Sequence, residues 1–174
     1  IEQKAKYPNI QYSIINVNQN ELIRLIVEGT IDIGFVQLNI FNETYVRNKI
    51  EMLQLMYEDV FESRLVVAVS QKHPLYGKKK VTLEELLPYE IVTGMTRAEE
   101  LVSYALFCEL QKLGYDKKIT CLGDIGVSRR YALRHNCIQL VPLIALEVTN
   151  RLYSNQVYPI ELEKQYDLKY LVVY

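Results

Sequence analysis

An α/β fold is predicted by a hydrophobic pattern that switches along the chain between the period of a strand and the period of a helix. Residues 10–14 alternate apolar and polar side chains, residues 20–28 carry an apolar stripe of helical period, and residues 31–36 form the apolar run of a buried strand. Gly29 stands where a left-handed residue often ends a helix. The short connections favour a parallel strand–helix–strand unit, which is typical of an α/β fold.

The rest of the chain continues this alternation. Thr82 with Glu85, and Thr96 with Glu99, have the spacing of capping boxes, and the second box precedes a predicted helix over 101–113 that Gly114 closes. The other expected elements are a loop at 39–49, strands at 52–58 and 64–70, a strand at 118–122, a helix at 127–134, a strand at 138–141 ended by Pro142, a helix at 143–150, and strands at 157–161 and 167–174.

The composition indicates a globular domain that does not itself bind nucleic acid. Hydrophobic residues make up 49% and charged residues 24% of the 174, which argues against disorder and coiled coil. Lys and Arg total 20 and Asp and Glu total 21, a net charge of −1, whereas a nucleic-acid-binding module usually has a strongly basic surface. The apolar runs are far shorter than the roughly 20 residues of a membrane-spanning helix, so no membrane partner is expected.

Five segments, taken in order, resemble the effector-binding domain of LysR-type transcriptional regulators. They are Tyr7–Ile10, Glu28–Gly34, Arg64–Leu75, Val81–Leu86 and Asn136–Pro142. No single segment is specific, but their order and separations fit the family along essentially the whole chain. The family usually has Gly-Xaa-Gly where this chain has Asn136 and Ile138. Asn tolerates the left-handed conformation and can replace the first glycine, whereas the change at Ile138 is less easily explained.

The resemblance implies a two-lobed, periplasmic-binding-protein-like (type II) α/β fold in which each lobe is a mixed sheet flanked by helices. Lobe I is expected over residues 1–70 plus 161–174, and lobe II over residues 71–160. Crossing strands would join the lobes, the second of them near 157–161. The resemblance also implies that an N-terminal winged helix-turn-helix, a linker helix and a first β-strand would precede Ile1, and that a final helix would follow Tyr174.

The geometry of α/β sheets and the resemblance together predict an effector site in the cleft between the lobes. Ligands of such sheets lie beyond the carboxyl ends of strands, where helix N-termini present unpaired N–H groups. For each residue of these loops, ordinary helix capping is the alternative explanation. The candidate effector-binding residues are Asn18, Gln19, Gln37 and Leu38 in the first lobe, and Thr93, Gly94, Met95, Thr96, Asp124, Gly126, Val127 and Ser128 in the second.

The sequence lacks the standard motifs of nucleophilic, zinc and phosphate chemistry, so no catalytic residue, metal ion or cofactor is expected. Asp32 in the predicted strand over 31–36 is conceivable as a general base, but the family has an Asp there routinely. His73 and His135 are expected to be structural. Cys121 and Cys137 are conceivable as a redox pair, but their spacing does not match the redox-sensing branch of the family, and buried free thiols are the alternative.

The expected function is therefore that of a ligand-sensing regulatory domain, not of an enzyme. Its partners would be a small-molecule effector such as an organic or amino acid, DNA only through the missing N-terminal domain, and further copies of itself in a homodimer or homotetramer. The odd number of cysteines forms no disulfide framework and favours the cytoplasm. A solute-binding protein of the same fold, used in transport or chemosensing, is the alternative, which the residues before Ile1 would distinguish.

Overall fold

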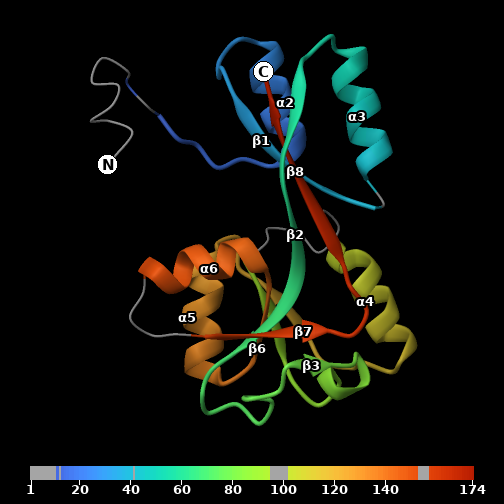
Figure 1. Cartoon of the computed structure of the whole chain (residues 1–174), viewed down its shortest axis with the longest axis vertical. Coiled ribbons are helices and arrows are strands. Elements are labelled where there is room, and N and C mark those ends of the chain that lie inside the picture. Colours follow the sequence, from blue (N-terminus) through green and yellow to red (C-terminus); the bar gives the residue numbers. More distant parts are fainter. Residues whose placement is uncertain (1–10, 12, 41, 95–101, 153–156) are drawn as a thin grey trace.

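The computed structural model describes residues 11, 13–40, 42–94, 102–152 and 157–174. Figure 1 shows two groups of helices and strands at opposite ends of the molecule, joined by the long strand β2 (Tyr57–Val69). The helices are α2 (Gln19–Val27), α3 (Glu43–Met52), α4 (Val102–Lys112), α5 (Ile125–His135) and α6 (Leu143–Leu152), with a 3₁₀ turn η1 (Glu84–Leu86). The other strands are β1 (Gly34–Asn39), β3 (Lys80–Val81), β4 (Ile91–Thr93), β5 (Ile119–Cys121), β6 (Ile138–Pro142), β7 (Tyr158–Leu162) and β8 (Asp167–Val173).

The strands of the described residues form one bent sheet in the order β1–β8–β2–β6–β4–β5, with β7 paired to β2 and β3. Residues 57–64 of β2 pair antiparallel with β8, which pairs antiparallel with β1. Residues 65–69 of β2 pair antiparallel with β6 and β7, and β4 lies parallel to both β6 and β5. Strand β2 therefore belongs to a small sheet with β8 and β1 and to a larger sheet with the remaining strands.

Each part of the sheet has its own hydrophobic core, because the helices bury their apolar faces on different strands. In the small sheet, α2 and α3 cover β1 and β8, and the buried residues are Ile23, Ile26, Val36, Leu38, Val46, Ile50, Leu171 and Val173. In the larger sheet, the main core joins β2, β4, β6, β7 and α4 and includes Leu65, Val67, Ile91, Leu106, Leu110, Ile138, Leu140 and Ile160. A further core under α6 contains Val66, Ala68, Val141, Leu146 and Val157.

Several local predictions are confirmed. Gly29 and Gly114 follow α2 and α4 with φ of 67° and 87°. Asn136 caps α5 in the left-handed conformation, with φ 52° and ψ 42°. In the first capping box the Glu85 N–H donates to Thr82 Oγ1 at 3.3 Å and the Thr82 N–H donates to Glu85 Oε2 at 3.0 Å, although the helix that follows is only the short η1. The second predicted box, at 96–99, lies outside the described residues.

The parallel strand–helix–strand unit predicted near the N-terminus is wrong as far as the described residues show. Residues 11 and 13–17 belong to no strand, and Ile14 is 93% exposed. Strand β1 begins at Gly34 instead of at residue 31, and its described partner is the antiparallel β8. Gly34 packs closely on α2, because a Cβ there would lie only 2.8 Å from Leu22 Cδ2.

The strand predicted at 64–70 is confirmed as the second half of β2, but the loop predicted at 39–49 and the separate strand predicted at 52–58 are wrong. Helix α3 occupies 43–52, and its buried residues are Val46 and Ile50, so its apolar stripe is too narrow to stand out as a helical period. A single strand, β2, then runs over 13 residues with an irregularity in its pairing between Asp59 and Phe61. Its exposed, charged middle hides the alternation, while pairing with β8 keeps the strand extended.

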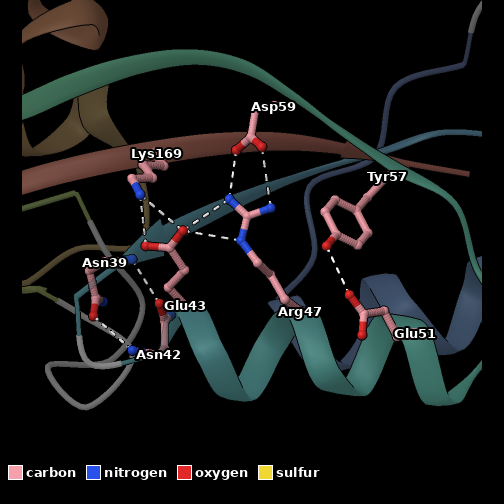
Figure 2. Close-up of polar contacts among 8 residues, drawn as sticks. All are labelled: Asn39, Asn42, Glu43, Arg47, Glu51, Tyr57, Asp59 and Lys169. Atoms are coloured by element: carbon pink, nitrogen blue, oxygen red, sulfur yellow. Dashed lines mark hydrogen bonds and ion pairs between the residues drawn. The ribbon is translucent and has the colours of Figure 1, made fainter.

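A network of charged side chains holds α3 against β2 and β8, as Figure 2 shows. Glu43 accepts hydrogen bonds from Lys169 Nζ and from Arg47 Nη2, both at 3.0 Å, and Arg47 Nη2 also donates to Asp59 Oδ1 at 2.7 Å. The hydrogen bond from Lys169 holds the pKa of Glu43 below its usual range, and the one from Arg47 does the same for Asp59. The network thus connects one helix to both strands that border the junction of the two sheets.

Candidate ligand-binding cleft

A cavity of about 1140 Å³ is lined by residues from both parts of the sheet. Its lining comes from α2 and the segment before it, from β1 and β8, from the end of β4, from the start of α5, and from the junction of β6 with α6. Ligand pockets for small molecules typically measure roughly 300–1,000 Å³, so this cavity has room for one. A smaller hollow of about 580 Å³ lies between η1, the end of α4 and the turn after β7 and contains none of the predicted site residues.

The first wall is the N-terminus of α2 with the residues before it. Asn18 is the N-cap, and its Oδ1 accepts the N–H of Glu21 at 3.0 Å, which explains why the helix begins here. Asn20 Oδ1 accepts a hydrogen bond from Lys49 Nζ at 2.9 Å, which joins α2 to α3. Arg24 bonds to the carboxylates of Glu21 and Glu28, so the only described cation of the lining is already compensated by two carboxylates.

The second wall lies on β1 and β8, where Gln37 and Tyr170 face each other in register. The Tyr170 hydroxyl donates to Gln37 Oε1 at 2.9 Å. The Tyr170 ring stacks on Phe61 of β2 with the ring centroids 4.5 Å apart. Burial in this stack raises the pKa of Tyr170 to about 12, so the phenol stays protonated and can donate at neutral pH.

The third wall is the end of β4 where it meets the start of α5. Thr93 is only 1% exposed, and its Oγ1 has no hydrogen-bond partner among the described residues. The next residue, Gly94, packs so closely on α5 that a Cβ there would lie 2.7 Å from the Cα of Ile125. Asp124 is the N-cap of α5 and accepts the N–H of Val127 at 2.7 Å. The strand end and the helix start therefore form one tightly packed unit.

The fourth wall, at the junction of β6 and α6, is apolar. Pro142 is the last residue of β6, and Ile144 and Ala145 lie in the first turn of α6. Ile144 and Ala145 are only half-buried, so part of their apolar surface is accessible from the cavity. The N–H of Ile144 donates to Ser63 Oγ of β2 at 3.2 Å, which fixes the start of α6 against the strand shared by both sheets.

Half of the predicted effector-binding residues line this cavity, and the other described candidates lie elsewhere. The residues brought together are Asn18, Gln19, Gln37, Thr93, Gly94 and Asp124. Leu38 lies inside β1 and in the core of the small sheet, so the prediction that it follows the strand is wrong. Gly126, Val127 and Ser128 lie within α5, which begins two residues earlier than predicted, and the cavity lining does not include them. Met95 and Thr96 lie outside the described residues.

Ser128 illustrates why a polar residue near a helix start need not belong to a site. It is fully buried, and its Oγ donates to the carbonyl of Ile125 at 2.9 Å and accepts from Gln139 Nε2 at 2.9 Å. Both hydrogen bonds are internal to the α5–β6 contact, so the side chain serves packing.

Sequence reasoning also missed much of the lining. The missed residues are Asn16, Val17, Asn20, Glu21, Arg24, Gly123, Ile125, Leu140, Val141, Pro142, Ile144, Ala145 and Tyr170. The sequence carried a signal for Asn16 and Asn20, because residues 16–20 are rich in carboxamides where a helix is predicted to begin. Tyr170 carried no local signal, since its place in the cavity depends on the pairing of β8 with β1 and β2.

The titratable groups considered from the sequence lie elsewhere. Asp32 is exposed and lies outside β1, which corrects the prediction that it is part of a buried strand. His73 is buried, and burial lowers its pKa and keeps the ring neutral. Its Nδ1 accepts the N–H of Leu75 at 3.2 Å. Burial raises the pKa of the Cys137 thiol to about 11 and also raises that of Cys121, which disfavours the reactive thiolate. Within the described ranges, no three His, Cys, Asp or Glu side chains are placed to hold a metal ion.

A bent α/β sheet whose two parts line one cavity is the architecture of a periplasmic-binding-protein-like fold. The family of the LysR substrate binding domain matches residues 2–174, so the chain belongs to this family. The HTH-type transcriptional regulator AceR of Acinetobacter baumannii is 21% identical over 104 residues, which are 60% of this chain and 32% of that relative. The chain thus aligns with about a third of the length of this relative.

Solved structures show the same fold. The regulatory domain of CcmR from Synechocystis PCC6803, in complex with 2-PG, matches with a TM-score of 0.67 and 15% identity, over 99% of this chain and 77% of that chain. The effector binding domain of BenM with its effector benzoate matches with a TM-score of 0.64 and 19% identity, over 98% of this chain and 72% of that chain. These likenesses confirm the predicted fold class. In the part of the chain that the structure describes, no helix is both long and apolar enough to cross a membrane.

Proposed function

We propose that this domain senses a small-molecule effector in the cavity between its two sheets and thereby regulates transcription. The observation that carries the proposal is the cavity of about 1140 Å³ with lining residues from both sheets of a LysR substrate-binding domain. CcmR and BenM, which share the fold, were solved with 2-PG and with benzoate, respectively. The family supports a regulator over the alternative of a solute-binding protein for transport or chemosensing.

The proposed mechanism is a change in the relative position of two lobes, with residues 1–70 plus 161–174 as lobe I and residues 71–160 as lobe II. An effector that contacts α2 and β1 on one side and β4, α5 and α6 on the other binds best to one relative position of these walls. It therefore shifts the equilibrium toward that position by its differential affinity. Strand β2 belongs to both sheets, so its middle is the natural place for the movement to concentrate.

The function of the whole protein follows from its family as part of the same proposal. The effector would act by binding, without a chemical reaction, and DNA would be contacted through an N-terminal winged helix-turn-helix. Homodimers or homotetramers would present paired DNA-binding domains, and the protein would work in the cytoplasm, where its DNA lies. Membership in a family of transcription regulators supports these points.

A thermal-shift screen tests the proposal, since a ligand that binds only the folded state raises the unfolding midpoint by mass action. The panel contains organic acids, amino acids, aromatic acids, their amides, and sugars. We expect at least one compound to raise the midpoint, and Gln37→Ala to weaken that response because Gln37 lines the cavity. Gln71→Ala is the matched control, since Gln71 is exposed and outside the lining. If both substitutions reduce the midpoint shift caused by a hit to the same extent, a site in this cavity is contradicted.

A further inference from the structure

The walls of the cavity differ in chemistry, and this difference indicates the class of its ligand. The wall formed by α2, the segment before it and β1 is rich in carboxamides, namely Asn16, Asn18, Gln19, Asn20 and Gln37. The β6–α6 junction is apolar, with Pro142, Ile144 and Ala145, and Ile125 of α5 packs on the same hydrophobic cluster, whereas Asp124 before it is polar. A ligand that fills the cavity therefore meets hydrogen-bonding groups on one side and hydrocarbon on the other.

The described charged groups of the lining are already engaged within the protein. Arg24 is held by the carboxylates of Glu21 and Glu28. Asp124 accepts the N–H of Val127 and so caps the N-terminus of α5. The hydrogen-bonding capacity that these described walls offer to a ligand is therefore mainly that of neutral groups. These are the carboxamides and one hydroxyl that, unlike the hydroxyl of Tyr170, has no partner among the described residues.

That hydroxyl is Thr93 Oγ1, which is buried and has no partner among the described residues. The backbone of the strand end that carries it is held in place. The N–H of Leu122 donates to the Thr93 carbonyl at 3.0 Å, and Gly94 is packed against Ile125. A buried polar group without a partner is costly and needs an explanation. Because Thr93 lines the cavity, a hydrogen bond from a ligand there would supply the missing partner.

From these observations we infer that the effector is a small amphipathic molecule. Its apolar body lies on the wall of Ile125, Pro142, Ile144 and Ala145, and its hydrogen-bonding head meets Thr93 and the carboxamides. This inference rests on the proposed function, because it names the ligand class of the same cavity. A polyhydroxylated molecule of equal size is excluded, since its hydroxyls would lose water against the apolar wall without gaining hydrogen bonds.

The first test compares two series of probes by calorimetric titration of the purified protein. One series is butanoate, pentanoate and hexanoate with the corresponding primary amides, and the other is gluconate and glucitol. Burial of each added CH₂ is expected to tighten binding about fourfold within the first series, and the polyols are expected not to bind at the same concentrations. A flat first series, tighter binding of the polyols, or no binding by any acid or amide would overturn the inference. The proposed function would then still be decided separately by the broader screen.

The second test uses variants of the two features that carry the inference. Thr93→Val keeps the shape of the side chain and removes the hydroxyl, so we expect hexanoate affinity to fall roughly three- to tenfold. The midpoint of the free protein should not fall, because no unpaired hydroxyl stays buried, and Thr93→Ser should retain most of the affinity. A lower midpoint with unchanged affinity would show that the hydroxyl is structural and would overturn the role of Thr93.

The apolar wall has its own matched pair of variants on α6. Ile144→Ala removes hydrocarbon from the wall and should weaken hexanoate more than butanoate, because the longer chain covers more of that surface. Val148→Ala is the control, since Val148 lies on the same helix but is exposed and outside the lining. Equal effects of the two substitutions on hexanoate would contradict an apolar body on this wall.

Discussion

Gly94→Ala should destabilise the protein through a steric clash alone. The backbone of Gly94 has no left-handed φ, so an added methyl group brings no conformational strain of its own. That methyl group would lie 2.7 Å from both the N and the Cα of Ile125. These are backbone atoms in the first turn of α5, so no side-chain rotation relieves the contact. Helix and strand must separate by several tenths of an ångström to reach ordinary van der Waals distance.

The expected cost lies at the upper end of the range for overpacked cores, about 3 kcal/mol. For a chain of this length it corresponds to a midpoint lower by roughly 6–12 °C. Because Asp124 and Ile125 line the cavity, the separation should also weaken the response to any ligand that binds there.

Urea unfolding and thermal unfolding measure this effect, with Gly77→Ala as the matched control. Gly77 has a φ of 88° and nothing within 4 Å of the position of its Cβ, so this substitution brings strain without a clash and should cost only about 1 kcal/mol. If Gly94→Ala costs no more than Gly77→Ala, the close packing of β4 on α5 does not hold in solution.

Two further predictions concern the turn after α5 and the charge network of α3. Asn136→Ala should cost about 2 kcal/mol of unfolding free energy, because alanine disfavours the left-handed conformation and loses the hydrogen bond that Asn136 Oδ1 accepts from Ser70 Oγ. Asn136→Gly should cost less than half as much, because glycine adopts this conformation freely. Equal costs in urea unfolding would refute the conformational argument. Glu43 has a folded-state pKa below its ordinary value because of Lys169 and Arg47, so its stabilisation is present near neutral pH and is lost as the pH falls through that depressed pKa. The stability difference between wild type and Glu43→Gln should therefore shrink below about pH 4, and a difference that stays constant from pH 7 to pH 3 would contradict the ion pairs.

The elements that the sequence predicted well are those with a complete local signal. Helix α2 has a broad apolar stripe, an asparagine N-cap and a left-handed glycine after its end. The same holds after α5, where Asn136 takes the left-handed conformation of the turn and the apolar residues that follow form the buried strand β6. In these segments the local preference and the packing require the same conformation, so a single sequence suffices.

The errors arose where distant contacts decide the structure. Helix α3 buries only Val46 and Ile50 and is held by ion pairs to β2 and β8, which no local pattern reveals. Strand β2 is extended through its polar middle because β8 pairs with it. For the same reason Tyr170 of β8 entered the cavity unpredicted. Leu38 was assigned to the site because the end of β1 was placed three residues too early.

The central claim is that a small effector binds in the cavity between the two sheets. The most direct test is a crystal structure of the protein with the tightest ligand found by the screen. The claim predicts density for the ligand in the cavity that Gln37 and Thr93 line, with a polar group of the ligand within hydrogen-bond distance of Thr93 Oγ1. Density for the ligand in the smaller hollow between Leu83 and Leu113, with the cavity holding only water, would contradict it.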